Sequence, residues 1–169
     1  MFESGAFVAE HLSPIDPEQV QPNGVDLTLE ALFRQREPGR VARDGKRVGE
    51  RETISPVDGA RDADEAGSSN ADSTPIYRLS PGGYVARYAE TIAVPEGHVG
   101  FVYPRSTLMR NSCTIDTAVW DAGYRGRGEG LLEVYHEVEI ERGARIAQFV
   151  LARAEHAGIY EGNYQGENL

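Results

Sequence analysis

The 169-residue chain predicts an all-β fold, either a sandwich or a barrel, with few short helices. Three observations support this class. Short runs alternate apolar and polar residues with period two, which is typical of half-buried strands. Turns containing Gly or Pro separate these runs at intervals of roughly 8–12 residues. No segment repeats its apolar residues at the 3.6-residue period of a long helix.

The expected elements follow an N-terminal lead-in. Residues 1–22 contain Pro14 and Pro17 and predict a short helical or irregular segment. Asn23-Gly24 is a turn signal, and the alternating run after it predicts a strand. The predicted strands cover residues 25–33, 84–88, 99–103, 131–140 and 145–152, and residues 89–94 continue into a turn at Pro95-Glu96-Gly97.

We expect one domain, residues 1–169, with an acidic surface excursion at residues 35–74. The excursion holds almost no large apolar side chain. Its segment 60–73 cannot bury enough apolar surface to offset the entropy of ordering it. We therefore interpret residues 35–74 as a surface hairpin with a mobile tip and solvated charges.

Composition argues against several classes of protein. The net charge of −10 argues against a DNA or RNA partner, because binding to a nucleic-acid backbone needs a basic face. No apolar run is long enough for a membrane span, and no signal peptide begins at Met1. Cys113 is the single cysteine, so we expect a reducing, cytoplasmic compartment. The cysteine and histidines also lack the spacing of a structural zinc site.

Residues 102–124 carry the strongest chemical signal. After an apolar strand, Arg105, Ser106, Thr107 and Arg110 form a donor-rich patch that suits phosphate oxygens. The alternative is an Arg-rich surface turn with a capping hydroxyl pair. What favours a site is Asp121, a lone acid that ends an apolar approach and precedes a glycine-rich turn.

Three further positions leave two interpretations open. Gln148 shares a predicted strand face with apolar residues, so its carboxamide is either satisfied in the core or aimed into a cleft. Asp26 is most simply a solvent-face residue or a turn partner, but an acid is disfavoured within a strand, so a specific role is equally open. The glycine-punctuated tail with Tyr160 and Tyr164 is either a mobile end or a flap that closes over a ligand.

Four ordered motifs resemble those of the trimeric dUTPases. They are GVDLTL at residues 24–29, PRSTL at 104–108, VWDAGYRG at 119–126 and GARIAQFV at 143–150. The chain is also similar to the related dCTP deaminases, above all in its ending YEGNYQGE. The segments TAVWD and RIAQFV are closer to the dUTPase branch.

The resemblance implies a distorted β-barrel or jelly-roll (β-clip-like) subunit in a homotrimer with active sites shared between subunits. It implies Mg²⁺-dependent hydrolysis of dUTP to dUMP and pyrophosphate, a reaction that needs a positioned water and neutralised charge. Mg²⁺ is usually held through substrate phosphates, so no protein cage is expected.

The resemblance also implies roles for individual residues. Asp121 would orient the attacking water, and Tyr124 would stack on the deoxyribose and exclude a 2′-hydroxyl. Asp26 would support the site. The phosphate side would be formed by Arg105, Ser106, Thr107, Arg110 and Gln148, with Tyr164 and Gln165 of the tail in place of the usual fifth dUTPase motif.

Two other functions stay open. The turn after Asp121 is two residues longer than the deaminase spacing, and a bulge there would put Glu133 in the position of the deaminase proton shuttle. The chain would then be a dCTP deaminase, or a bifunctional enzyme that also hydrolyses the triphosphate. Alternatively, Glu133 lies on a solvated face. A non-catalytic trimeric nucleotide-binding module is the third hypothesis.

Overall fold

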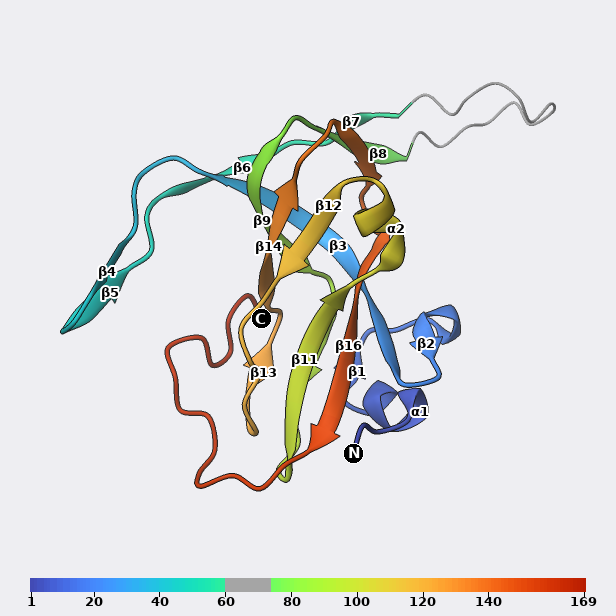
Figure 1. Ribbon diagram of the computed structural model, residues 1–169, viewed down its shortest axis with the longest axis vertical. Helices are drawn as coiled ribbons and strands as arrows, with labels where there is room; N and C mark the ends of the chain where they lie inside the picture. Colours follow the sequence, from blue (N-terminus) through green and yellow to red (C-terminus); the bar gives the residue numbers. More distant parts are fainter. Residues whose placement is uncertain (60–73) are drawn as a thin grey trace.

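The structure is a computed structural model, and it describes residues 1–59 and 74–169 (Figure 1). In these two ranges the helices are short: α1 (Gly5–Ala9), α2 (Ser106–Arg110) and one 3₁₀ turn, η1 (Pro17–Gln19). None of these helices is long and apolar enough to cross a membrane. Strands make up most of the rest, so the predicted all-β class with few short helices is confirmed.

One eight-stranded antiparallel sheet forms the body of the described protein. Its main path runs in the order β11-β16-β3-β9-β14-β12, and β2 and β6 both pair with β3. These strands are β2 (Val20–Gln21), β3 (Gly24–Gln35), β6 (Arg51–Ile54), β9 (Gly82–Tyr88), β11 (His98–Pro104), β12 (Cys113–Asp116), β14 (Glu129–Val134) and β16 (Arg145–Arg153).

Smaller antiparallel sheets complete the described ranges. Their orders are β1-β10-β13, β15-β8-β7 and β4-β5. The strands are β1 (Leu12–Ser13), β4 (Arg40–Ala42), β5 (Gly45–Arg47), β7 (Val57–Asp58), β8 (Pro75–Leu79), β10 (Thr91–Ala93), β13 (Arg125–Gly126) and β15 (Val138–Glu141). Figure 1 shows the sheets curling around a common core, as expected for a distorted barrel.

The central strand β3 explains why the solvent-face interpretation of Asp26 is wrong. Successive residues of a strand point to opposite faces, and residues 24–27 of β3 are all buried, so protein covers both faces of the strand here. Val25, Leu27 and Leu29 are almost fully buried, and Asp26 between them is 1% exposed. A buried carboxylate needs charged partners, and these are found in the site described below.

The prediction of one strand over residues 131–140 is wrong. β14 ends at Val134, a bend follows, and β15 begins at Val138. β14 pairs with β9 and β12, whereas β15 pairs with β8 in a different sheet. The alternating pattern continues across the bend, but the chain changes sheets there. Period two alone carries no information about which strand is the partner.

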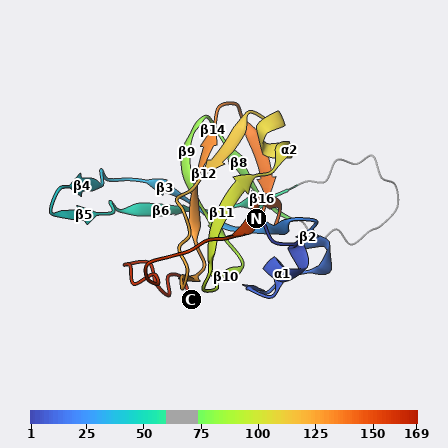
Figure 2. The same cartoon turned by 60° about the horizontal axis from the view of Figure 1, so that its bottom comes forward.

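The region 35–74 is only partly a surface excursion. Its described part leaves the barrel as an arm, tipped by the β4–β5 hairpin, and β6 then returns to pair with β3 (Figures 1 and 2). The exposed tip includes Val41, which is 96% exposed. The segment 60–73, for which a mobile tip was predicted, lies outside the described residues.

Candidate functional site

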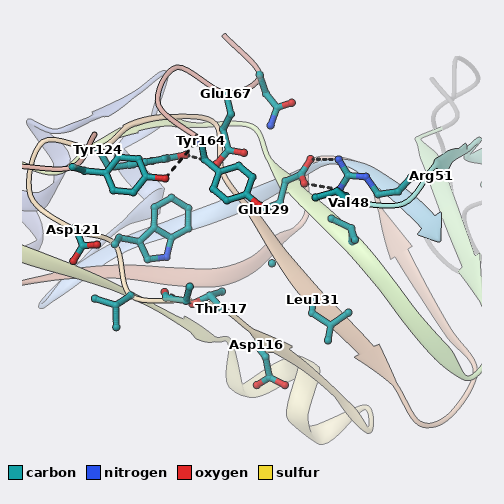
Figure 3. A pocket seen from close by; sticks show the side chains of 17 residues that line it. Val48, Arg51, Asp116, Thr117, Asp121, Tyr124, Glu129, Leu131, Tyr164 and Glu167 are labelled. Carbon is teal, nitrogen blue, oxygen red and sulfur yellow. Dashed lines mark hydrogen bonds and ion pairs between the residues drawn. The ribbon is translucent and has the colours of Figure 1, made fainter. Parts of the chain in front are cut away.

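A cavity of about 680 Å³ opens between the loop 117–124, β14 and the C-terminal tail (Figure 3). We call it the aromatic pocket because Trp120, Tyr124, Tyr160 and Tyr164 all line it. Asp121 lines it too, and its side chain is exposed. Two residues with sequence-predicted roles, the acid and the sugar-facing ring, therefore share one cavity.

Backbone hydrogen bonds hold the Asp121 loop on both sides. The N–H of Trp120 donates to Gly100 O at 3.1 Å, and the N–H of Gly100 donates to Trp120 O at 2.8 Å. After the acid, Gly123 takes a φ of +86° and donates to Val94 O at 2.8 Å. A positive φ favours glycine, so Gly123 lets the loop turn sharply directly after Asp121. The Asp121 carboxylate makes no hydrogen bond or ion pair within the described chain.

The glycine-rich turn makes room for two aromatic rings. Trp120 and Tyr124 pack edge to face, with centroids 5.0 Å apart. A Cβ at Gly128 would collide with the Trp120 ring, and a Cβ at Gly126 would lie 2.7 Å from the Tyr124 hydroxyl oxygen. Both rings are buried, at 8% and 5% exposed. The absence of side chains at Gly126 and Gly128 thus allows the Trp120 and Tyr124 rings to pack beside Asp121.

Glu129 is a pocket residue that the sequence analysis missed. Arg51 donates to it at 2.6 Å (Figure 3). Arg87 lies 3.1 Å away, so the carboxylate is held between two guanidiniums. Arg51 comes from β6, at the base of the arm. No local motif links these residues, because the pair joins positions 78 residues apart. Only the tertiary pairing reveals it.

The C-terminal tail is docked on the loop that carries Asp121. Gln165 Oε1 accepts from the Arg125 N–H at 3.0 Å, and its Nε2 donates to Gly123 O at 3.0 Å. Lys46 at the tip of the arm lies over the Tyr164 ring at 4.8 Å. The tail therefore packs against the pocket in this structure, whereas the mobile-end interpretation predicted that it would stand free. Both polar atoms of the Gln165 carboxamide form hydrogen bonds with the loop and not with the pocket interior.

A second group of predicted residues, which we call the arginine cluster, lies on β3, β16 and the end of β11. The Arg105 guanidinium pairs with the buried Asp26 carboxylate, and Arg145 lies 3.6 Å from the same oxygen. Burial lowers the pKa of Arg105, and the neighbouring Arg145 lowers it further. Arg145 was not predicted from the sequence. Asp26 is thus the anchor that holds two guanidiniums side by side.

The remaining donors flank this pair. Gln148 is directly opposite Asp26 on β3 and Tyr103 on β11, so these side chains project to one face. The half-buried carboxamide of Gln148 makes no hydrogen bond within residues 1–59 and 74–169. On α2, Arg110 donates to Ser106 Oγ at 3.1 Å, and Thr107 is exposed beside them.

The described chain does not place the two groups in one cavity. The residues that line the aromatic pocket include none of the arginine cluster. Glu133, the alternative deaminase residue, lies outside the pocket as well. It is half-buried on β14 opposite Thr114 and Gly83, and it accepts a hydrogen bond from the Tyr135 hydroxyl.

The described residues contain no group of three or more His, Cys, Asp or Glu side chains that could hold a metal ion. The arginine cluster sets two guanidiniums, Arg105 and Arg145, beside one carboxylate, Asp26, and Arg110 adds a third guanidinium that donates to Ser106. Such a donor set suits an anion rather than a bare cation. It fits a metal that arrives already bound to phosphate oxygens.

Comparisons with known proteins agree with this architecture. A family model described as dCTP deaminase-like matches residues 2–154. A Halobacterium salinarum protein named probable deoxyuridine 5′-triphosphate nucleotidohydrolase is 56% identical over 167 residues, or 99% of this chain and 95% of that protein. The deoxyuridine 5′-triphosphate nucleotidohydrolase of Methanocaldococcus jannaschii is 32% identical, covering 90% of both chains.

A solved structure shares the fold. The crystal structure of 2′-deoxycytidine 5′-triphosphate deaminase from Agrobacterium tumefaciens matches with a TM-score of 0.60 at 18% identity. The match covers 90% of this chain and 48% of that one, so the chain spans about half of the deaminase. At this identity the similarity concerns the fold alone.

Proposed function

The chain belongs to the dCTP deaminase-like family, and from this premise we propose that it hydrolyses dUTP to dUMP and pyrophosphate. The relatives named deoxyuridine 5′-triphosphate nucleotidohydrolase support this choice within the family, because one of them is 56% identical over almost the whole chain. The bond that breaks joins the α- and β-phosphates, and water supplies the oxygen.

The observation that carries the proposal is the aromatic pocket itself. It combines an exposed acid, Asp121, with a buried ring, Tyr124, in one cavity large enough for a nucleoside. A carboxylate without a side-chain partner is available to accept a proton from water. The ring beside it offers a flat apolar face to a deoxyribose and leaves little room for a 2′-hydroxyl.

The arginine cluster would bind the triphosphate. Its guanidiniums present planar forks of N–H donors that match phosphate oxygens, and Ser106, Thr107 and Gln148 add neutral donors. Asp26 is 1% exposed and would act indirectly, because it fixes the direction of Arg105 and Arg145. Donors held in place before substrate binds need no reorganisation during the reaction.

A homotrimer would unite the two groups, each active site taking the aromatic pocket from one subunit and the arginine cluster from the next. Exposed apolar side chains around both groups support a subunit interface, since such patches mark contact surfaces. They include Tyr103, Met109, Val119, Leu131 and Tyr135, each between 42% and 66% exposed.

Mg²⁺ would enter with the triphosphate. When bound, it neutralises phosphate charge and so lowers the cost of separating pyrophosphate. This chain would contribute the guanidiniums of the arginine cluster on the phosphate side and leave the Asp121 carboxylate free for the water.

Side-by-side incubation with dUTP and dCTP tests the function, with pyrophosphate and ammonia scored separately and with Mg²⁺ present or chelated. We expect Mg²⁺-dependent pyrophosphate release from dUTP and no ammonia from dCTP. Ammonia release would support the deaminase, and binding without either product would support the non-catalytic module. Either result would overturn the proposal.

Mixed trimers test the shared site. Asp121→Asn lacks the acid, and the double variant Ser106→Ala/Arg110→Ala lacks exposed phosphate donors, so each should be nearly inactive alone. After joint unfolding and refolding, random assembly of a shared site should restore about a quarter of the wild-type activity. The same treatment of each variant alone is the control. No recovery in the mixture would mean that one subunit holds the whole site.

A further inference from the structure

The last residues of the tail are fixed by the turn that follows Tyr124. Gly166 N–H donates to Arg125 O at 2.8 Å, and Arg127 N–H donates to Glu167 O at 3.0 Å. Asn168 Nδ2 donates to Arg127 O at 2.8 Å. These bonds set the backbone of Glu167 from both sides, so its side chain has a defined direction. That direction leads into the aromatic pocket (Figure 3).

The Tyr124 hydroxyl depends on this carboxylate. It donates to Glu167 Oε1 at 2.8 Å, although the two residues are 43 positions apart. Tyr124 is 5% exposed, and a buried tyrosine hydroxyl normally needs a partner. No other hydrogen bond of this hydroxyl is found in the described chain. Glu167 therefore supplies the polar contact of the ring.

The ring is held at its other edges by aromatic contacts. Trp120 meets it at an interplanar angle of 89° and Tyr160 at 70°, with centroids 5.0 and 5.7 Å away. Such edge contacts hold the sides of the ring. The hydroxyl bond holds its far end and so restrains the direction of the ring axis. Both Tyr160 and Glu167 belong to the tail, so docking of the tail completes the clamp.

We propose that Glu167 is a positioning residue that fixes the Tyr124 ring through its hydroxyl, so that the sugar-facing wall of the pocket takes its final shape only when the tail is docked. Glu167 acts through Tyr124 and makes no contact with the substrate. The inference rests on the proposed function for the identity of the sugar, but not for the bond itself. A loosened ring would lose discrimination against a 2′-hydroxyl.

Two readouts on the full-length protein test this role. The first is acrylamide quenching of Trp120, the single tryptophan of the chain, which reports tail docking without any activity. The second is the ratio of kcat/KM for dUTP over UTP. A residue that merely anchored the tail would change the quenching but not this ratio beyond the loss of overall activity.

Glu167→Ala leaves the Tyr124 hydroxyl without an acceptor, and we expect the dUTP/UTP ratio to fall by about threefold to tenfold with easier quenching. Glu167→Gln keeps an acceptor and should retain the wild-type ratio. Tyr124→Phe removes the donor. The double variant Tyr124→Phe/Glu167→Ala should lose no more than Tyr124→Phe alone, because the two changes remove the same bond.

Glu161→Ala is the matched control. This exposed tail carboxylate makes no hydrogen bond or ion pair with the described residues, so its removal should leave both readouts unchanged. Additive losses in the double variant, or a Glu167→Ala ratio equal to wild type, would overturn the proposal. If the wild-type protein did not hydrolyse dUTP, the proposed function would fail. The quenching series would still decide whether Glu167 and Tyr124 act as one unit.

Discussion

In the arginine cluster, Asp26 and Gln148 are direct neighbours on two central strands, whereas in the aromatic pocket Asp121 and Tyr124 lie on a loop. The Asp26 side chain is 1% exposed, whereas the Asp121 side chain is exposed. The Asp26 carboxylate pairs with two guanidiniums, whereas the Asp121 carboxylate has no side-chain partner among the described residues.

This difference separates two tasks. Hydrogen-bond donors that bind a charged ligand must be held rigidly, and paired strands provide this rigidity. As a consequence, each donor residue also contributes to the stability of the fold. An acid that meets water must stay accessible, so a loop held at its ends suits it better. Substitutions in the aromatic pocket should therefore change activity with little effect on folding. Substitutions in the arginine cluster should change both.

The largest effect is expected for Asp121→Asn. Loss of the proton acceptor should lower kcat for dUTP by about 10²–10⁴-fold, while dUTP affinity and the melting temperature stay near wild type. Asp116→Asn, another exposed acid that lines the same pocket, is the matched control and should keep most activity. Comparable losses in both variants would show that pocket charge matters rather than one acid.

Arg105→Ala should be next and should affect both binding and stability. It leaves Asp26 with only Arg145 at 3.6 Å, so we expect about 3 kcal/mol less stability in urea unfolding, the lower end for a buried pair that loses a partner. Affinity for dUTP should fall more than affinity for dUMP, measured by calorimetry in an Asp121→Asn background.

The double variant Asp26→Asn/Arg105→Ala separates these two effects. Removing the buried charge should recover most of the lost stability, because no unpaired carboxylate remains. It should not recover dUTP affinity. If affinity returned together with stability, Arg105 would have only a structural role.

A smaller effect is expected from pH, through Glu167. Burial raises the pKa of this carboxyl in the docked tail; Glu129 raises it further, whereas the Tyr124 hydroxyl, Arg87 and Arg51 lower it. A raised pKa means that the contribution of Glu167 to docking is fully present below the ordinary glutamate value of about 4.5 and is lost as pH rises through the raised pKa. Trp120 quenching should therefore increase as pH rises above the ordinary glutamate range, and Glu167→Gln should remove this pH dependence.

Much of the fold could be predicted from local patterns. Period two located β3, β9, β11 and β16 to within a few residues. The observed burial alternates along β9 and β11, whereas β3 and β16 carry consecutive buried residues. The change of sheet between Val134 and Val138 could not be found in this way, since partner choice is a tertiary property. The burial of Asp26 was missed for the same reason. Both faces of β3 are covered by protein at this position, and this covering depends on tertiary packing.

The site was predictable only where a motif is contiguous. Asp121 and Tyr124 lie three positions apart in one motif, and the structure puts both in one cavity. Arg51, Glu129 and Glu167 come from three distant segments, and nothing in their local sequence distinguishes them from other surface charges. Contacts between residues far apart in the sequence depend on the strand pairing of the folded protein, which cannot be deduced from a single sequence.

The smallest effect is expected for Glu133→Gln, which sharpens the contrast between the two carboxylates of β14. Glu129 lies in the aromatic pocket between two guanidiniums, whereas Glu133 lies outside it and accepts only from Tyr135 within the described chain. Glu133→Gln should therefore change kcat/KM for dUTP by less than about twofold, because exposed or half-exposed surface contacts carry little energy. Glu129→Gln is the comparison variant. It leaves Arg51 and Arg87 without a charged partner in the pocket wall and should lower activity more. A large loss in Glu133→Gln alone, accompanied by ammonia release from dCTP in the wild type, would instead assign Glu133 to deamination across a subunit boundary.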